Sequence, residues 1–242
     1  MIQRGHTSIK IELALEDWNN WYMTSSYRPI VIGVALAGIL ALLFITSILL
    51  LQRTGVENPF AQLDLKIFGF IVAYTLVSYL VISKLGIETV GRQKIRNLHW
   101  FGRSLGSDIS IGIAGAILGS CCIFTSGWIF GAWSPTTFLE QESSFSFNQR
   151  VLFLLIGMNA GLIEETLFRG YLQPAFIAKT STIVGIALTS LIFALYHLNF
   201  HPLGFAGKLI LGFVFGVIRG RENPLLRSSI AHAGTWLFIG AV

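Results

Sequence analysis

Hydrophobic residues occupy long uninterrupted stretches of this chain instead of alternating with polar ones. Residues 30–51, 67–83 and 109–132 contain no charged side chain. A helix needs about 20 residues to cross the roughly 30 Å hydrocarbon core of a bilayer, because each residue adds about 1.5 Å. These three stretches are therefore expected to be transmembrane helices.

Four further apolar stretches follow, and they are shorter and carry ionisable residues within them or at their ends. They cover residues 151–163, 182–198, 203–218 and 228–242. The whole pattern predicts an all-α fold, a polytopic transmembrane helical bundle with about seven spans. The number of helices in the bundle rises to eight if the basic segment 84–108 forms an interfacial helix.

The composition agrees with a membrane protein and excludes other classes. Hydrophobic residues make up 53% of the 242 residues, charged residues only 12%, and the mean hydropathy is +0.68. A soluble domain usually carries about 25% charged residues. A soluble monomer, a disordered chain and a nucleic-acid-binding arm are therefore poor fits. We expect a multi-pass integral protein of a bacterial-type cell membrane, with the lipid bilayer as its surroundings and no nucleic-acid partner.

The distribution of Lys and Arg predicts the orientation of the bundle. With the N-terminus in the cytoplasm, few of the 17 Lys and Arg residues lie outside, namely Arg53, Lys66, Arg150 and Lys208. Cytoplasmic loops carry an excess of these residues, so this orientation is favoured. Residues 1–29 are then a cytoplasmic or interfacial segment, and residues 30–242 form a single transmembrane domain.

The densest group of charges among the apolar stretches is Glu164, Glu165 and Arg169. Glu165 and Arg169 are four residues apart with the acid first, which favours an ion pair within one helix. Glu164 points about 100° away from Glu165 on the same helix. A carboxylate without an ion-pair partner on its own helix, such as Glu164, can act as a general base on a water molecule. The alternative is a solvated helix end at the membrane interface.

Two histidines, His197 and His232, lie in later apolar stretches. A single histidine in an apolar helix usually satisfies a structural hydrogen bond. Two on separate helices, together with an intramembrane glutamate, favour a convergent polar site, because charge inside the bilayer is costly without a partner or a purpose. The same three residues also suit a proton relay, so a proton-coupled transporter is an alternative.

The order Glu164-Glu165-x-x-x-Arg169, then Phe193-x-x-x-His197, then His232 resembles the CAAX-protease and bacteriocin-processing family (CPBP, or Abi) of intramembrane glutamate-type endopeptidases. The resemblance covers about residues 151–237. It implies a membrane-embedded protease that cleaves a peptide or protein substrate with an activated water and without a cofactor. Whether the substrate is prenylated does not follow from it.

The resemblance also implies roles for individual residues. Glu164 and His197 would activate the water, and His232 would contribute to stabilising the oxyanion. Glu165 and Arg169 match motif positions with a structural and electrostatic role, in agreement with their spacing.

One position departs from the family pattern. The family usually has Asn, or another polar residue, four positions after the last histidine, and here that position is Trp236. Loss of one oxyanion donor can cost about 10²–10³ in rate. Either Trp236 reshapes the site, or Asn159 or Asn199 substitutes, or the chain is a catalytically inactive member that serves as an immunity or assembly partner of another membrane protein.

A zinc site is an alternative for the same residues. His197 and His201 have the spacing of metal ligands on one helix face, and Glu164 or His232 would complete a tetrahedral set. Against this, His201 precedes Pro202, which disfavours helical geometry at His201.

The predicted spans place the three polar residues at different depths in the membrane. Glu164 and His232 fall toward the cytoplasmic side, whereas His197 lies about 22 Å into the fifth helix. A common site requires the fourth helix to continue through Tyr171 to about Gln173, before Pro174, and the fifth helix to begin deeper or tilt.

Overall fold

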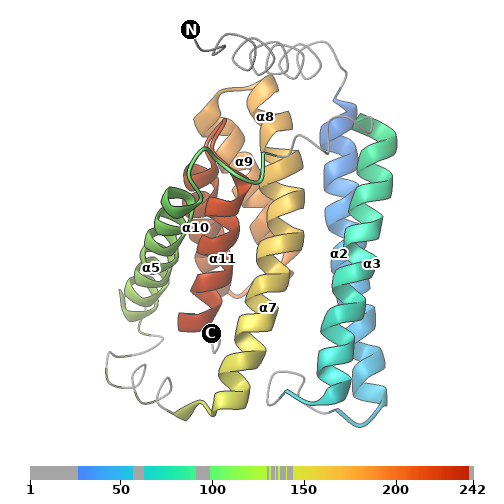
Figure 1. The fold of residues 1–242 in the computed structure, drawn as a ribbon, viewed down its shortest axis with the longest axis vertical. Helices are drawn as coiled ribbons and strands as arrows, with labels where there is room; N and C mark the ends of the chain where they lie inside the picture. Colours follow the sequence, from blue (N-terminus) through green and yellow to red (C-terminus); the bar gives the residue numbers. More distant parts are fainter. Residues whose placement is uncertain are drawn as a thin grey trace, which may run out of the picture.

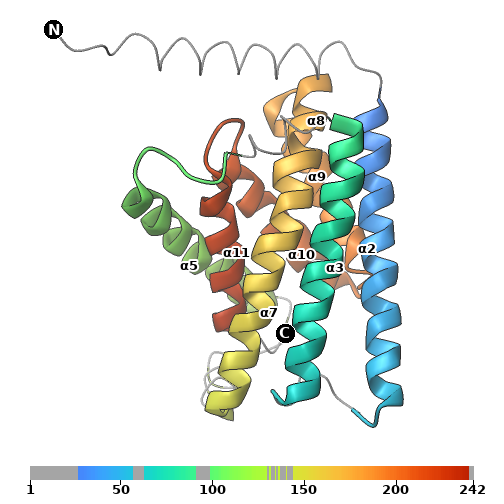
Figure 2. The same cartoon turned by 45° about the vertical axis from the view of Figure 1, so that its right-hand side comes forward.

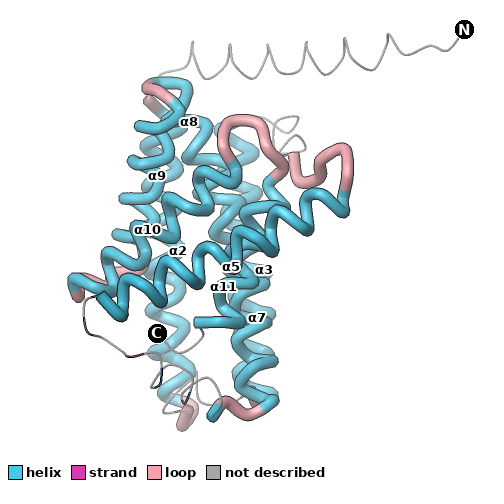
Figure 3. Tube along the Cα trace, turned by 90° about the vertical axis from the view of Figure 1, so that its left-hand side faces the viewer, coloured by secondary structure: helices cyan, strands magenta, loops and turns pink. Residues whose placement is uncertain are grey.

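The structure is a computed structural model in which every regular element is a helix in the part of the chain that it describes (Figures 1 and 3). It describes residues 27–56, 63–90, 99–129 and 144–239, and four single residues between the last two ranges, Gly131, Ser134, Thr136 and Glu140. The prediction of an all-α membrane bundle is confirmed. The expected N-terminal segment lies almost entirely outside the described residues, as does the middle of the basic segment 84–108.

Three long helices account for the first three apolar stretches. They are α2 (Arg28–Arg53), α3 (Leu65–Val90) and α5 (Leu105–Ile129). Each begins a few residues before the predicted stretch, and α3 also ends seven residues later. Many of their large apolar side chains are exposed, including Leu42 at 66% and Leu76 at 60%. A soluble monomer rarely exposes so much contiguous apolar surface, whereas lipid tails would cover it.

The fourth apolar stretch continues much further than its hydrophobic part. It comprises α7 (Phe147–Glu165), the π-helical segment η1 (Thr166–Leu172) and α8 (Gln173–Lys179), which follow one another without a break. Together they form a rod of 33 residues. A capping box starts the rod, because Ser146 and Gln149 satisfy each other's backbone N–H groups.

The rod passes through Pro174, whereas the extension required for a common site needed to reach only about Gln173. Pro174 lies in the first turn of α8, directly after the wider π-helical turn. A proline within a continuous helix removes one backbone hydrogen bond to the preceding turn, and the rod tolerates that loss here. The extension past Tyr171 that a common site requires is therefore present, and it is six residues longer than expected.

The last three helices are α9 (Thr182–Tyr196), α10 (Pro202–Arg219) and α11 (Leu225–Ile239). In the described part of the chain, five helical stretches are long and apolar enough to span a bilayer: α2, α3, α5, the rod and α10. The helix α9 is a shorter apolar helix. The exact number of spans and the cytoplasmic N-terminus stay predictions.

The helices form two groups that meet at the rod. Helices α2 and α3 lie beside each other along one side, and α5 lies on the opposite side of the bundle (Figures 1 and 2). Helix α11 packs against both α5 and α7, and α10 packs against both α9 and α5. Helix α2 reaches the rod at η1, and α3 reaches it at α7.

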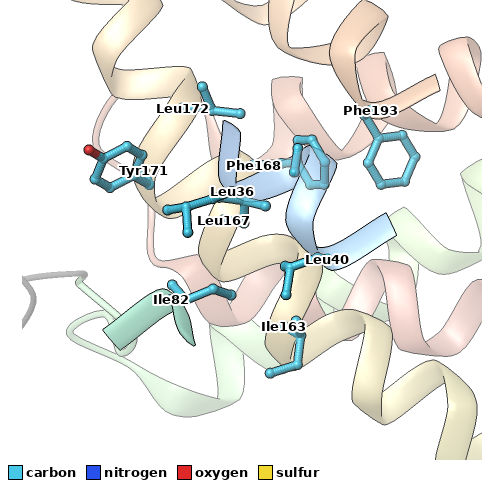
Figure 4. Packing of buried hydrophobic residues seen from close by; sticks show 10 residues of the cluster. Leu36, Leu40, Ile82, Ile163, Leu167, Phe168, Tyr171, Leu172 and Phe193 are labelled. Atoms are coloured by element: carbon cyan, nitrogen blue, oxygen red, sulfur yellow. The ribbon is translucent and has the colours of Figure 1, made fainter. Parts of the chain in front are cut away.

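A buried apolar cluster joins α2 to the rod and to α9 (Figure 4). It includes Leu36 and Leu40 of α2, Leu167 and Phe168 of η1, and Phe193 of α9. A second cluster lies toward the other end of the α2–α3 pair and contains Leu51, Ile67 and Leu152. These two clusters hold the α2–α3 pair against the rod at two levels and leave the space between them for the cavity described below.

Glycines allow the closest helix contacts. A Cβ atom built on Gly161 of α7 would lie 2.6 Å from the backbone oxygen of Ser229 in α11. One built on Gly212 of α10 would lie 3.1 Å from the Cα atom of Ser190 in α9. Small residues at such positions let transmembrane helices approach closely. The tight packing of α7, α9, α10 and α11 sets the rotation of each helix, and therefore which side chains meet.

Candidate active site

Glu164, His197 and His232 converge, although they come from three different helices or helix ends. The Oε2 atom of Glu164 lies 3.8 Å from Nε2 of His197 and 3.9 Å from Nε2 of His232. All three side chains are largely withdrawn from the surface, with 15%, 16% and 5% of their areas exposed. The structure therefore brings together the three residues that the sequence singled out.

The length of the rod explains why Glu164 and His197 lie at the same depth. Glu164 is 15 residues before the end of α8 at Lys179, and His197 is 15 residues after the start of α9 at Thr182. Because α8 and α9 form an antiparallel hairpin, each is about 22 Å from the turn between them. The problem of depth disappears because the α8–α9 turn lies well beyond the end of the fourth apolar stretch.

His232 reaches the same level because the turn between α10 and α11 lies closer to the site than the α8–α9 turn does. The Gln173 side chain donates hydrogen bonds to the backbone oxygens of Gly216 and Gly220, which places the end of α10 beside the start of α8. From there α11 runs back along α7. His232 is seven residues after the start of α11, and Glu165 is eight residues before Gln173, so the two side chains meet.

Hydrogen bonding defines the form of the His197 ring. Its Nδ1 atom lies 2.8 Å from the backbone oxygen of Phe193. A carbonyl oxygen can only accept, so Nδ1 carries the hydrogen. In the neutral ring the lone pair is then on Nε2, the nitrogen that faces Glu164. A backbone contact at i−4 thus directs the acceptor of His197 toward the carboxylate, a tautomer control often seen for functional histidines.

Glu165 and Arg169 form the ion pair that their spacing predicts. Arg169 Nη1 donates to Glu165 Oε1 at 2.8 Å, and both side chains are fully buried. The other guanidinium nitrogen, Nη2, donates to the backbone oxygen of Gly212 at 2.9 Å. The pair therefore ties the rod to α10. Charges removed from water in this way need several partners to be tolerated.

Glu165 also positions His232. Glu165 Oε1 lies 3.0 Å from Nδ1 of His232. The ionised carboxylate accepts, so Nδ1 of His232 carries a hydrogen and Nε2 is the nitrogen turned toward Glu164. The two neighbouring glutamates consequently have different partners. Glu165 holds Arg169 and His232, and Glu164 faces two imidazole Nε2 atoms.

Aromatic rings enclose these polar groups. Phe193 lies 4.6 Å from the His197 ring and 5.6 Å from the His232 ring, measured between centroids. Its face is 4.5 Å from the Arg169 guanidinium carbon. Phe215 stacks on His232 at 4.7 Å. The sequence assigned Phe193 to the site from its motif position, and the structure gives it contacts with three of the polar groups.

The π-helical segment η1 coincides with the site. All seven of its residues are buried, including Arg169. Short π-helical turns inside α-helices are rare and occur frequently at functional sites. Here the widened turn follows Glu164 and Glu165 directly and carries Arg169, the cationic partner of Glu165.

Glu164 Oε2 is a buried oxygen that accepts no hydrogen bond from the residues that the structure describes. Its distances to the two imidazole nitrogens exceed those of a hydrogen bond. Two acceptors about 4 Å apart are, however, spaced so that one small donor such as water can hydrogen-bond to both. The arrangement can therefore bind and polarise a water molecule.

A cavity of about 470 Å³ opens from Glu164 and His197. Its walls come from α2, α3 and α7 and are mostly apolar, with Phe44, Ile48 and Phe70 among them. It lies between the two apolar clusters that hold the α2–α3 pair to the rod. The polar groups are gathered at one end. Such a combination of an apolar wall with a few convergent polar groups is typical of a binding site.

The expected substitutes for the missing family asparagine lie around this cavity. Trp236, Asn159 and Asn199 all contribute to its lining. The Asn159 amide donates to the Thr75 hydroxyl of α3. Asn199 Oδ1 accepts from the backbone N–H of His201. The Asn159 NH2 group and the Asn199 side-chain oxygen are thus engaged with neighbours, whereas Trp236 faces Lys208.

The structure separates His201 from the other histidines. His201 is exposed and has an extended backbone immediately before Pro202, as the proline predicted. Within the described ranges, no three His, Cys, Asp or Glu side chains are arranged so that they could hold a metal ion.

Three site residues were not assigned from the sequence. Lys208 lines the cavity, and so do Tyr196 and Tyr74, whose hydroxyl oxygens are 3.4 Å apart. Lys208 is the single charged residue in the apolar stretch 203–218, and that is the signal the sequence offers for it. Neither tyrosine stands out, because tyrosine in an apolar helix is ordinary and the contact joins residues 122 positions apart.

Comparison with known proteins agrees with the resemblance seen in the sequence. Residues 146–238 match the model of a family described as type II CAAX prenyl endopeptidase Rce1-like. The match covers the rod from its start, α9, α10 and nearly all of α11, and hence every residue of the candidate site except those on α2 and α3. No curated protein and no solved structure matches the chain. The family is one of proteases, and residues 146–238 of the chain are similar to it.

Proposed function

We propose that this Rce1-like membrane protein is an intramembrane endopeptidase that hydrolyses a peptide bond with a water activated by Glu164 and His197. The observation that carries the proposal is the environment of Glu164 Oε2. It is a buried carboxylate oxygen without a hydrogen-bond partner among the described residues, and two imidazole nitrogens lie 3.8 and 3.9 Å from it.

The first step is activation of water. A water between Glu164 Oε2 and His197 Nε2 donates one hydrogen to each and turns its lone pairs toward the substrate. The water then attacks the carbonyl carbon of the scissile peptide bond, forming a C–O bond, while Glu164 takes one of its protons. The π electrons of the carbonyl move onto its oxygen, which becomes the oxyanion.

The second step breaks the peptide bond. The oxyanion reforms the carbonyl, the C–N bond breaks, and the electron pair of this bond goes to nitrogen. Glu164 returns its proton to the leaving amine. The carboxylate is thereby regenerated, and each turnover consumes one water. General acid–base catalysis of this kind contributes about 10²–10⁴ in rate.

His232 is assigned to the oxyanion. Glu165 holds its Nδ1–H, so Nε2 donates to an oxyanion when the ring is protonated. Glu165 and Arg169 support this role without touching the substrate. They fix the orientation of His232 and anchor the rod to α10.

The substrate is proposed to be a peptide or a protein segment at the membrane. The apolar walls supplied by α2, α3 and α7 suit apolar parts of such a substrate, and they keep bulk water away from the polar end. Exclusion of water strengthens the electrostatic interactions within a site.

The test uses the full chain purified and reconstituted in liposomes. The probe is a fluorogenic peptide ending in a CAAX sequence, supplied in a farnesylated and an unmodified form, with products identified by mass spectrometry. In water enriched in ¹⁸O, we expect one ¹⁸O atom in the new carboxylate. Glu164→Gln and His197→Ala should each reduce cleavage by at least about 10², because each removes one group that activates the water.

Matched controls change residues of the same two types outside the site. His201→Ala changes an exposed histidine four positions after His197, and Glu222→Gln changes an exposed glutamate. Both should cleave at the wild-type rate. Full activity of Glu164→Gln would remove the mechanism, and inhibition by 1,10-phenanthroline that zinc reverses would favour the metalloprotease instead.

The alternative of a non-catalytic membrane partner rests on Trp236. It is favoured if the wild-type protein cleaves neither form of the peptide and Glu164→Gln leaves the cellular phenotype unchanged. Disruption of the α9–α10 contact through Gly212→Leu would then be expected to abolish that phenotype.

A further inference from the structure

Lys208 is a cation that the mechanism above leaves unused. It lies in the second turn of α10 and lines the cavity together with Glu164, His197 and Trp236. Among the described residues lining the cavity, Glu164 and Lys208 are the only two with a formal charge. Lys208 forms no salt bridge with any described carboxylate, although the charge of Glu164 is near enough to act on it.

The position of Lys208 on α10 directs it toward the site. Gly212 is four residues further along the helix and Phe215 is seven, so the three lie on one helix face. The Gly212 backbone oxygen accepts from Arg169, and the Phe215 ring stacks on His232. The face of α10 that carries Lys208 is therefore the face that packs on the catalytic groups.

Trp236 holds the ammonium group. Lys208 Nζ lies 5.5 Å from the centroid of the Trp236 ring. A lysine ammonium within about 6 Å of an aromatic face is attracted by the ring. Trp236 is four residues after His232 and so projects from the same side of α11. A cation thus lies against the position where the family usually has an amide donor.

We propose that the ammonium group of Lys208 donates a hydrogen bond to the oxyanion and replaces the missing asparagine donor. The inference rests on the proposed function, and it makes Lys208 a catalytic residue of this chain outside the motif. Trp236 is a positioning residue, because it acts through the lysine side chain.

The charges at the site support this role. Arg169 neutralises Glu165, which leaves one negative charge on Glu164 and one positive charge on Lys208. When Glu164 takes the water proton, the negative charge moves to the substrate oxygen. Lys208 keeps its proton throughout and serves as the counter-ion both before and after the transfer. No net charge has to be created in a sheltered site where unpaired charge is costly.

Lys208 also supplies a donor that His232 lacks in its neutral form. With Nδ1–H held by Glu165, the neutral His232 ring has only a lone pair on Nε2 to turn toward the substrate. An ammonium group has three donors and no acceptor. Lys208 can therefore stabilise the oxyanion whether or not His232 is protonated.

The experiment compares Lys208→Met, Lys208→Arg and wild type in liposomes with the same fluorogenic peptide. Loss of one oxyanion donor typically costs about 10²–10³ in kcat. We expect Lys208→Met to lower kcat by about 10² with KM changed less than about threefold, and Lys208→Arg to retain most of kcat. Lys66→Met, which changes an exposed lysine bonded to the Thr54 backbone oxygen, is the matched control and should leave kcat unchanged.

A second measurement does not depend on turnover. A phosphinic peptide carries a tetrahedral, negatively charged group in place of the scissile bond. Its affinity should fall in Lys208→Met by about the same factor as kcat/KM. The affinity of the uncleaved peptide, measured with Glu164→Gln in both backgrounds, should stay constant.

A third comparison separates the oxyanion from a carboxylate on the substrate. If Lys208 bound the free C-terminus of the peptide, amidation of that terminus would raise KM in wild type and leave Lys208→Met unaffected. That result would overturn the inference, and so would equal phosphinate affinities in the two proteins. Either outcome with normal wild-type cleavage leaves the proposed function standing, whereas absence of wild-type cleavage removes both.

Discussion

Replacement by Gln should affect the free energy of unfolding very differently at the two adjacent glutamates, Glu164 and Glu165. Glu165 is fully buried, pairs with Arg169 at 2.8 Å and contacts His232 at 3.0 Å. Glu165→Gln keeps the shape of the side chain but leaves the buried Arg169 guanidinium without its counter-ion. Breaking a buried ion pair by removing one partner typically costs about 3–5 kcal/mol. We expect Glu165→Gln to lower the free energy of unfolding by that amount.

Glu164→Gln should not destabilise the fold. The Oε2 atom of Glu164 accepts no hydrogen bond from the described residues, so the substitution removes a buried charge without breaking such a bond. Lys208 is only partly buried and keeps its contact with the Trp236 ring, unlike the fully buried Arg169. We expect a change in the free energy of unfolding below about 1 kcal/mol, or a gain, as is common when a residue is kept for function at the expense of stability. The variant should nevertheless be inactive.

The assay is equilibrium unfolding in bicelles, with tryptophan fluorescence as the readout and peptide cleavage measured in parallel. The double variant Glu165→Gln with Arg169→Met serves as the control for the ion pair. It should lose less stability than the two single losses added together, with a coupling of about 0.5–3 kcal/mol. Equal stabilities of Glu164→Gln and Glu165→Gln, or an additive double variant, would refute the division of roles between the two carboxylates.

Two further predictions concern the packing of the bundle. Gly161→Ala should lower the free energy of unfolding by about 1–3 kcal/mol, since its Cβ would meet the Ser229 backbone oxygen at 2.6 Å. The control Gly38→Ala, whose Cβ meets nothing within 4 Å, should not destabilise the protein, and equal thermal stabilities of the two variants would contradict this. Asp108→Asn should lower the free energy of unfolding by about 1.5–3 kcal/mol, because Asp108 is buried and accepts a hydrogen bond from Arg227 Nε at 2.8 Å. Thermal unfolding that matches wild type would show that this link between α5 and α11 contributes little.

The long helices could be predicted because apolar runs specify membrane-spanning helices without any knowledge of their neighbours. Residues 30–51 are apolar over a length that crosses a bilayer, and α2 contains all of them. The same argument is weaker at the polar ends of helices. Residues 151–163 are only the apolar part of the rod, whose continuation to Lys179 depends on buried partners for Arg169 and Gln173 on α10.

The roles within the motif were only partly accessible from sequence. Helical spacing predicted the Glu165–Arg169 pair and the separate direction of Glu164, because residues four apart share a helix face whatever surrounds them. The contact of Glu165 with His232 joins residues 67 positions apart. No local rule predicts such a contact, since it depends on where α11 begins and how it is rotated against α7.

The sequence by itself determined the class of the protein, the approximate helices and the identity of three polar residues on separate stretches. Only the tertiary structure decided that they meet. The α8–α9 turn lies further out than the α10–α11 turn, and this offset brings Glu164, His197 and His232 to one level. Close contacts at glycines fix the rotation of each helix about its axis, so that these side chains, and Lys208 beside them, face inward. Sequence patterns record the period of one helix, whereas depth and rotation are properties of helices packed together.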